Sequence, residues 1–142
     1  MTSAYIPKAI RQRVAEQARY RCGYCLSAET ISGYSMEVDH LIPQALGGPT
    51  LEGNLWLACS ACNLFKGHRI SAQDPESGRV VRLFNPREQR WEEHFLWDES
   101  GTRVVGRTAV GRATVTALHL NRPLLVRARL SWVEVGWHPP AD

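Results

Sequence analysis

Four cysteines of this 142-residue chain form two Cys-x-x-Cys pairs, Cys22/Cys25 and Cys59/Cys62. Two thiolates across a tight turn can bind a tetrahedral Zn²⁺, and four thiolates leave no coordination position open for chemistry. The two pairs lie further apart than in the commonest zinc ribbons, so the segment between them must itself be folded. We therefore predict one structural zinc on all four cysteines. Two disulfides, a redox dithiol and free thiols without zinc are the alternatives.

A second set of candidate residues lies between and just after the cysteine pairs. In chain order it consists of Asp39-His40, an apolar-Pro stretch, Gly47-Gly48, Asn54-Leu55, Asn63 and Lys66. A neutral imidazole can take a proton from water at physiological pH. Carboxylate and amide oxygens are hard ligands that suit Mg²⁺ or Mn²⁺ better than zinc. An Asp-His dipeptide alone is usually a hydrogen-bonded surface turn. Only the complete series of these residues, in this order, indicates a functional site.

The segment from Cys22 to Lys66 resembles the HNH endonuclease family. It contains the cysteine pair, Asp-His before an apolar-Pro stretch, paired glycines, Asn-Leu, and Cys-x-x-Cys-Asn-x-x-Lys. The resemblance implies a ββα-metal core with a treble-clef-like zinc site, and hydrolysis of phosphodiester bonds in DNA, with RNA not excluded. The downstream half, with Leu83–Arg87, Trp91–Phe95 and Gly111–Thr114, looks more loosely like small stand-alone bacterial HNH proteins.

The resemblance also implies a role for each matching residue. His40 would be the general base that deprotonates water. Asp39 and Asn63 would bind one Mg²⁺ or Mn²⁺, which offsets charge on the phosphate and the leaving group. Asn54 would orient the histidine and brace the loop between the strands. Lys66, three residues after Asn63 and on the same helical face, would contact a DNA phosphate.

Two other classes of function compete with an endonuclease. The first is a zinc-stabilised nucleic-acid-binding or protein-interaction module without catalysis, in which Asn54 and Asn63 are plain caps or turn residues and Lys66 is solvated. Such a module has no reason to keep a base beside a hard-metal ligand. The second is a redox protein, which lacks the βαβ context that its Cys-x-x-Cys motif needs.

The candidate residues are positioned by short elements in the N-terminal half. Helical spacing after Pro7 predicts a helix to about Tyr20, which runs into the first cysteine pair. Alternating residues from Tyr34 predict a strand that ends at Asp39-His40. A second short strand over 54–58 then leads through Cys59 into a helix that carries Asn63 and Lys66. The predicted order is strand, strand, helix.

The C-terminal half has a different pattern. We predict a turn at 74–78, a strand over 80–84, a hairpin around 98–101, and helices over about 111–120 and 122–135. Thr108 and Asn121 are candidate helix caps, and Gly136 ends the last helix. The fold class is therefore α+β, with a C-terminal β-hairpin and helices packed on the core. We expect a single domain over 1–142, with a core of about 18–70 and an extension of about 71–142.

Composition and charge limit the cellular setting. The chain is 44% hydrophobic and 22% charged, which is ordinary for a folded domain, and its net charge of +3 is compatible with a phosphate-bearing partner. The N-terminal segment from Met1 to Lys8 shows no export signal, and no apolar run approaches membrane-spanning length. We expect a cytoplasmic protein with no membrane partner. The sequence does not specify an oligomeric state.

Overall fold

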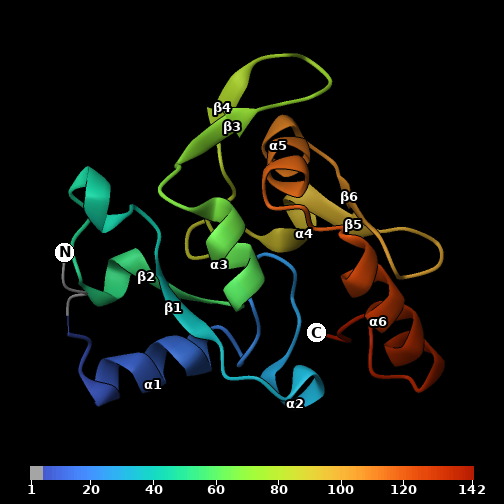
Figure 1. The fold of residues 1–142 in the computed structure, drawn as a ribbon, viewed down its shortest axis with the longest axis horizontal. Helices are drawn as coiled ribbons and strands as arrows, with labels where there is room; N and C mark the ends of the chain where they lie inside the picture. The colour runs from blue at the N-terminus through green and yellow to red at the C-terminus, as the bar shows by residue number, and fades with distance from the viewer. Residues whose placement is uncertain (1–4) are drawn as a thin grey trace. The chain divides into compact units, whose positions relative to one another are not determined.

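The chain folds into mixed helices and strands in a computed structural model that describes residues 5–142 (Figure 1). We expect no export signal in the segment from Met1 to Lys8. Residues 1–4 of that segment lie outside the described part of the chain. The expected α+β class is confirmed. The chain forms two compact units, residues 5–70 with 85–88, and residues 71–84 with 89–142. None of the described helices combines the length and apolar character needed to cross a membrane.

The first unit contains the predicted strand–strand–helix order. Its elements are α1 (Lys8–Gln17), α2 (Glu29–Ser32), β1 (Glu37–His40), the short 3₁₀ helices η1 (Gln44–Leu46) and η2 (Glu52–Asn54), β2 (Leu55–Ala58) and α3 (Ser60–Lys66). Strands β1 and β2 pair antiparallel, with His40 opposite Leu55. Helix α1 contacts β2 and α3 contacts β1 (Figure 1). Buried Val14, Leu55 and Leu57 supply apolar contacts of this unit.

The loop between β1 and β2 depends on Gly47 and Gly48. Gly47 has a φ of +85°, which L side chains rarely adopt. A Cβ on Gly48 would lie 1.8 Å from the carbonyl oxygen of Ile42, so no side chain fits there without moving the backbone. The paired glycines therefore let the loop fold back against the end of β1.

The second unit contains two antiparallel hairpins and two longer helices. Its elements are β3 (Ser71–Gln73), β4 (Val80–Arg82), α4 (Trp91–His94), β5 (Phe95–Trp97), β6 (Val104–Gly106), α5 (Ala109–Ala117) and α6 (Pro123–Glu134). The predicted β5–β6 hairpin is confirmed. The sequence did not predict β3, because Ser-Ala-Gln has little strand propensity and its pairing with β4 comes from the backbone.

The two predicted helix caps have different outcomes. Thr108 accepts a hydrogen bond from the Gly111 amide and caps α5, as predicted. The prediction for Asn121 was wrong, because α6 has no side-chain cap. The Asn121 amide instead pairs with both backbone groups of Val104. This bidentate pairing satisfies two strand-end groups that a cap would have left open.

The turn between β3 and β4 is stabilised by a buried carboxylate. Asp74 is fully buried and receives two hydrogen bonds of 2.9 Å from the Arg112 guanidinium. Its carboxylate also accepts from the Ser77 hydroxyl and from two turn amides. Hydrogen bonds from Arg112 and then from Ser77 hold the pKa of Asp74 well below its ordinary value of 3.8. Asp74 therefore joins the β3–β4 turn to α5.

Asp74→Asn should lower the melting temperature near neutral pH, because Arg112 loses the buried carboxylate with which it pairs. The pKa of Asp74 is lowered in the folded state, so its contribution is full above about pH 4 and is lost as the pH falls through that lowered pKa. Melting curves followed by circular dichroism should therefore show a smaller acid-side loss of stability in the variant than in the wild type. Glu76→Gln is the control, since Glu76 also contacts Arg112 but its side chain is 73% exposed. Parallel wild-type and Asp74→Asn curves down to about pH 2 would contradict this role.

Candidate functional site

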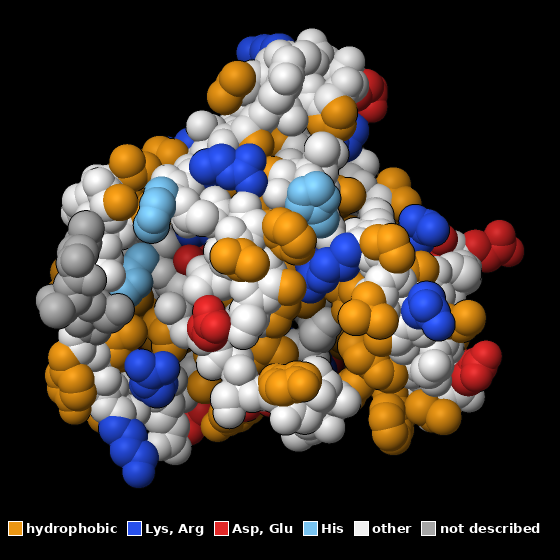
Figure 2. All heavy atoms as spheres, in the orientation of Figure 1, with side chains coloured by type: hydrophobic (Ala, Val, Ile, Leu, Met, Phe, Trp, Pro, Cys, Tyr) orange, Lys and Arg blue, Asp and Glu red, His pale blue; other side chains and the backbone are white. Residues whose placement is uncertain are grey.

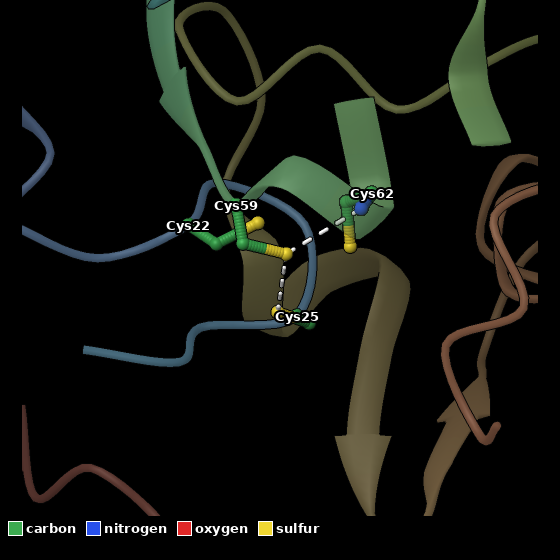
Figure 3. A group of neighbouring side chains, drawn as sticks. All are labelled: Cys22, Cys25, Cys59 and Cys62. Atoms are coloured by element: carbon green, nitrogen blue, oxygen red, sulfur yellow. Dashed lines mark hydrogen bonds between the residues drawn. The ribbon is translucent and has the colours of Figure 1, made fainter. Parts of the chain in front are cut away.

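The four cysteines converge from two segments far apart in the sequence (Figure 3). Cys22 and Cys25 lie on the loop that follows α1, Cys59 directly follows β2, and Cys62 lies in the first turn of α3. Their sulfur atoms all lie within 4.8 Å of one another. The sulfurs of Cys22 and Cys59 each accept a backbone N–H bond of 3.4 Å, from Tyr24 and Cys62 respectively. The structure thus contains both predicted knuckles.

The dimensions of this cluster suit a tetrahedral metal ion. A tetrahedron with Zn–S bonds of about 2.3 Å has sulfur–sulfur edges of about 3.8 Å. Cys25 Sγ and Cys59 Sγ lie 3.7 Å apart. The cysteines are not bridged, which argues against the two-disulfide alternative. Burial raises the pKa of the Cys22 thiol, so a thiolate there needs a compensating cation. Four sulfur ligands at this spacing can hold one zinc ion.

Asp39, at the end of β1, lies inside a network of hydrogen bonds. One of its carboxylate oxygens accepts from the Tyr24 hydroxyl at 2.7 Å, and the other accepts from Lys66 Nζ at 3.1 Å. Burial raises the pKa of Tyr24, so its hydroxyl stays protonated and donates. Asp39 is only 4% exposed. Each carboxylate oxygen has two acceptor positions, so one on each oxygen remains for a metal ion.

Lys66 lies in the interior and not on the surface. It is 2% exposed, and its ammonium also donates to the backbone carbonyls of His40 and Leu41, at 3.0 and 3.2 Å. The three donor positions of the ammonium are therefore used within the first unit. A phosphate contact, as predicted from the sequence, would require Lys66 to leave these partners. The geometry favours a positioning role, in which Lys66 fixes α3 against the end of β1.

His40 lies beside Asp39 and is partly exposed. Its Nε2 lies 2.9 Å from the hydroxyl oxygen of Thr50. Its Nδ1 has no hydrogen-bond partner among residues 5–142. Desolvation, reinforced by the Lys66 charge and opposed by the Asp39 charge, lowers the pKa of His40 below 6.5. The imidazole is therefore neutral at physiological pH, and one ring nitrogen faces no protein donor.

Asn54 braces the loop that connects β1 to β2. Its amide oxygen accepts from the Ile42 amide at 2.9 Å, and its amide nitrogen donates to the carbonyls of Ile42 and Pro49 at 3.0 and 2.9 Å. The backbone carbonyl of Asn54 accepts from the Leu41 amide. One buried residue at the end of the loop thus holds its beginning, next to His40, and its interior, next to Thr50.

Asn63 faces the exposed carboxylate of Glu37 across α3 and β1. The Asn63 amide nitrogen donates to one Glu37 oxygen at 2.8 Å, and the Ser60 hydroxyl donates to the other at 2.8 Å. This contact orients the Asn63 amide, because only its nitrogen can donate to a carboxylate. Its oxygen has no hydrogen-bond partner in the described part of the chain. That oxygen could therefore accept a hydrogen bond or bind a cation.

The sequence did not single out Tyr24 or Thr50 as site residues. Tyr24 occupies one of the two unspecified positions of the first Cys-x-x-Cys pair, and its contact with Asp39 joins two segments that only the fold brings together. Thr50 follows Pro49 in the loop, ten residues after His40. Neither position has a spacing that links it to the candidate site, so no pattern in the sequence indicates either residue.

The comparison with protein families bears directly on this segment. Residues 22–69 match the family model described as HNH endonuclease. The match begins at the first cysteine and includes β1, the braced loop, β2 and α3. Residues 22–69 form an HNH domain. This result confirms the resemblance found in the sequence, over about a third of the chain.

Beyond the HNH domain, one relative extends the similarity. The chain is 27% identical to the Septu protein PtuB of Bacillus mycoides (strain KBAB4), in an alignment that covers 69% of this chain and 41% of that protein. The chain thus spans about two fifths of that relative's length. No solved structure matches the chain.

On the face drawn in Figure 2, Lys and Arg side chains are scattered among hydrophobic and uncharged ones and do not merge into one patch.

We expect the HNH domain to contain one zinc ion per chain, measured by metal analysis of protein purified without added zinc. Cys59→Ser should abolish zinc binding and destabilise the domain by at least about 4 kcal/mol, because the binding free energy of a structural zinc contributes directly to folding. Thermal or denaturant unfolding measures this loss. Ala61→Ser, in the same turn, is the matched control and should keep the zinc. Zinc-free protein with wild-type stability in the Cys59→Ser variant would refute the assignment.

Proposed function

We propose that this chain is a metal-dependent endonuclease that hydrolyses phosphodiester bonds in DNA. His40 is the general base, Asp39 and Asn63 bind one Mg²⁺ or Mn²⁺, and Asn54 holds the loop beside the base. The four cysteines hold a structural zinc away from the chemistry. The HNH match over residues 22–69 supports the endonuclease class.

One observation carries the proposal. Helix α3 lies along β1 so that Lys66 bonds to Asp39 and Asn63 bonds to Glu37. These two contacts bring the end of β1, with its carboxylate and its neutral histidine, to the helix that presents an unbonded amide oxygen. A base and two hard oxygen donors are thus gathered on adjacent elements. A purely structural zinc module does not need this combination.

The donor set suits a hard divalent ion. Asp39 supplies a carboxylate oxygen and Asn63 an amide oxygen, and Mg²⁺ typically binds through one or two such protein ligands together with water and substrate phosphate oxygens. A bound ion supplies charge stabilisation for the phosphate and the leaving oxygen. Tyr24 and Lys66 hold Asp39 in position by hydrogen bonds, and Glu37 holds Asn63. Ligands oriented in this way need little rearrangement when the ion binds.

The chain's own residues then account for the hydrolytic step. Neutral His40 takes a proton from a water molecule as the water oxygen attacks phosphorus. The phosphorus–oxygen bond to the leaving group breaks, and the departing oxygen takes a proton from solvent. Lys66 and Asn54 do not touch the substrate in this scheme, because their side chains are fully engaged with the protein. They position the residues that do.

A direct assay uses supercoiled plasmid with Mg²⁺ or Mn²⁺, with and without EDTA. We expect metal-dependent conversion to nicked or linear product, and the ratio of the two products distinguishes nicking from double-strand cleavage. A single-stranded RNA of matched length, assayed in parallel, distinguishes DNA from RNA as substrate. Binding without cleavage under all metal conditions would favour the zinc-stabilised binding module instead.

His40→Ala should reduce the cleavage rate by roughly 10²–10⁴-fold, because it removes the group that deprotonates water. Zinc content, melting temperature and DNA affinity should stay near wild type, since affinity for DNA comes mainly from basic side chains. The wild-type rate should fall only as the pH drops through the lowered pKa of His40, below 6.5, because the protonated ring cannot act as a base.

His68→Ala is the matched control for this variant. His68 is exposed just beyond the end of α3, so its removal should leave the cleavage rate and its pH profile unchanged. Imidazole added to His40→Ala should restore part of the rate. A fully active His40→Ala protein would overturn the proposed mechanism.

Asn63→Ala should raise the Mg²⁺ or Mn²⁺ concentration needed for half-maximal cleavage by roughly 10–100-fold, because it deletes one metal ligand. Metal titrations of the initial cleavage rate measure the shift. Ser60→Ala is the control, because Ser60 also donates to Glu37 but offers no ligand in this scheme. An unchanged titration for Asn63→Ala, or an equal shift in both variants, would show that Asn63 is not a ligand.

A further inference from the structure

Thr50 contacts the candidate general base, His40, although it lies outside the sequence motif. The Thr50 hydroxyl oxygen lies 2.9 Å from His40 Nε2, within hydrogen-bond range. Both side chains are partly buried. The Gln44 side-chain amide also points a donor at the same oxygen, at the longer distance of 3.5 Å. A hydroxyl oxygen has two acceptor positions, so it can receive both donors at once.

We propose that Thr50 is a positioning residue for the general base. It accepts a hydrogen bond from Nε2–H of His40, fixes the ring and its tautomer, and leaves Nδ1 as the nitrogen that takes the proton from water. This inference rests on the proposed function of His40 and names the residue that prepares it.

The tautomer matters because a neutral imidazole carries one proton on its two nitrogens. If Nε2 carries it, Nδ1 has a free lone pair and no competing donor among residues 5–142. If Nδ1 carried the proton, the free lone pair would lie at Nε2, where the Thr50 hydroxyl would occupy it. Only the first arrangement leaves the unpartnered nitrogen able to act as a base. A hydroxyl can either accept from Nε2–H or donate to Nε2, so we assign Thr50 the acceptor role that this arrangement requires.

The loop fixes Thr50 where this role requires it. Asn54 holds the carbonyl of Pro49, directly before Thr50, and both backbone groups of Ile42, two residues after His40. Gly48 approaches the Ile42 carbonyl so closely that a Cβ cannot be accommodated. The backbones that carry Thr50 and His40 are therefore tied to one buried amide. Their side-chain contact is a consequence of a braced loop and not of two freely rotating surface residues.

The test compares Thr50→Val with Thr50→Ser. Valine has nearly the shape of threonine but cannot accept a hydrogen bond, whereas serine keeps the hydroxyl. We expect Thr50→Val to lower kcat for plasmid cleavage by roughly 10–100-fold, the usual range for partners that orient an active group. KM, DNA affinity and melting temperature should change little. Thr50→Ser should keep the rate within about threefold of wild type.

A double variant separates positioning from a general structural effect. If Thr50 acts through His40, adding Thr50→Val to His40→Ala should cause no further loss beyond the residual rate of His40→Ala. An additive loss in the double variant would contradict the proposal, as would wild-type kcat in Thr50→Val.

A spectroscopic measurement tests the same contact without any cleavage. Long-range ¹H–¹⁵N correlation spectra of the folded protein at about pH 8 report which nitrogen of a neutral histidine carries the proton. We expect His40 as the Nε2–H tautomer in wild type and Thr50→Ser, and a mixture of tautomers in Thr50→Val. An Nδ1–H tautomer in wild type would overturn the proposal. If His40→Ala cleaves as fast as wild type, the proposed function fails; if only Thr50→Val does, the role of Thr50 fails alone.

Discussion

The candidate site depends most on the buried ion pair between Lys66 and Asp39. A buried charge pair is tolerated only when its remaining donors and acceptors are also satisfied, because both groups lose their hydration. Here the Lys66 ammonium has two backbone carbonyls as further acceptors, and Asp39 has the Tyr24 hydroxyl as a further donor. Removing one partner would leave an uncompensated charge in the interior. The pair therefore sets the position of α3 along β1, and with it the position of Asn63 relative to His40.

Two other sets of contacts, or tethers, stabilise different parts of the first unit. The cysteine cluster joins the loop after α1 to the beginning of α3, and Asn54 joins the two ends of the loop between the strands. None of these tethers uses the imidazole of His40 or the amide oxygen of Asn63. The proposed base and the proposed amide ligand are thus kept out of these stabilising contacts, whereas Asp39 takes part in them through Lys66 and Tyr24. This separation lets a small domain of short elements keep reactive groups available.

Most of the elements that position the candidate site could be predicted from the sequence, but only some of the contacts within the site could. Cysteine spacing, the alternation before His40 and the cap at Thr108 each follow from local rules, and the structure agrees with them. Burial of Lys66 and the contact of Thr50 with His40 could not be predicted, because each depends on segments at least ten residues apart in the chain. The capping role expected of Asn121 failed for a similar reason, since a strand end competes for the same amide.

Cys59 is both a member of the sulfur cluster and the residue that caps α3. Its sulfur accepts the amide of Cys62, so the first turn of the helix that carries Asn63 and Lys66 is held by a metal-binding atom. The proposed Mg²⁺ or Mn²⁺ site would then depend on the sulfur site, because an ion bound by the four sulfurs would be needed before Asn63 reaches its place. A chelator that removes only the proposed Mg²⁺ or Mn²⁺ would cause a reversible loss of cleavage activity. A chelator that also removes an ion from the four sulfurs would free α3 from its fixed position. Adding back Mg²⁺ alone would then not restore cleavage activity.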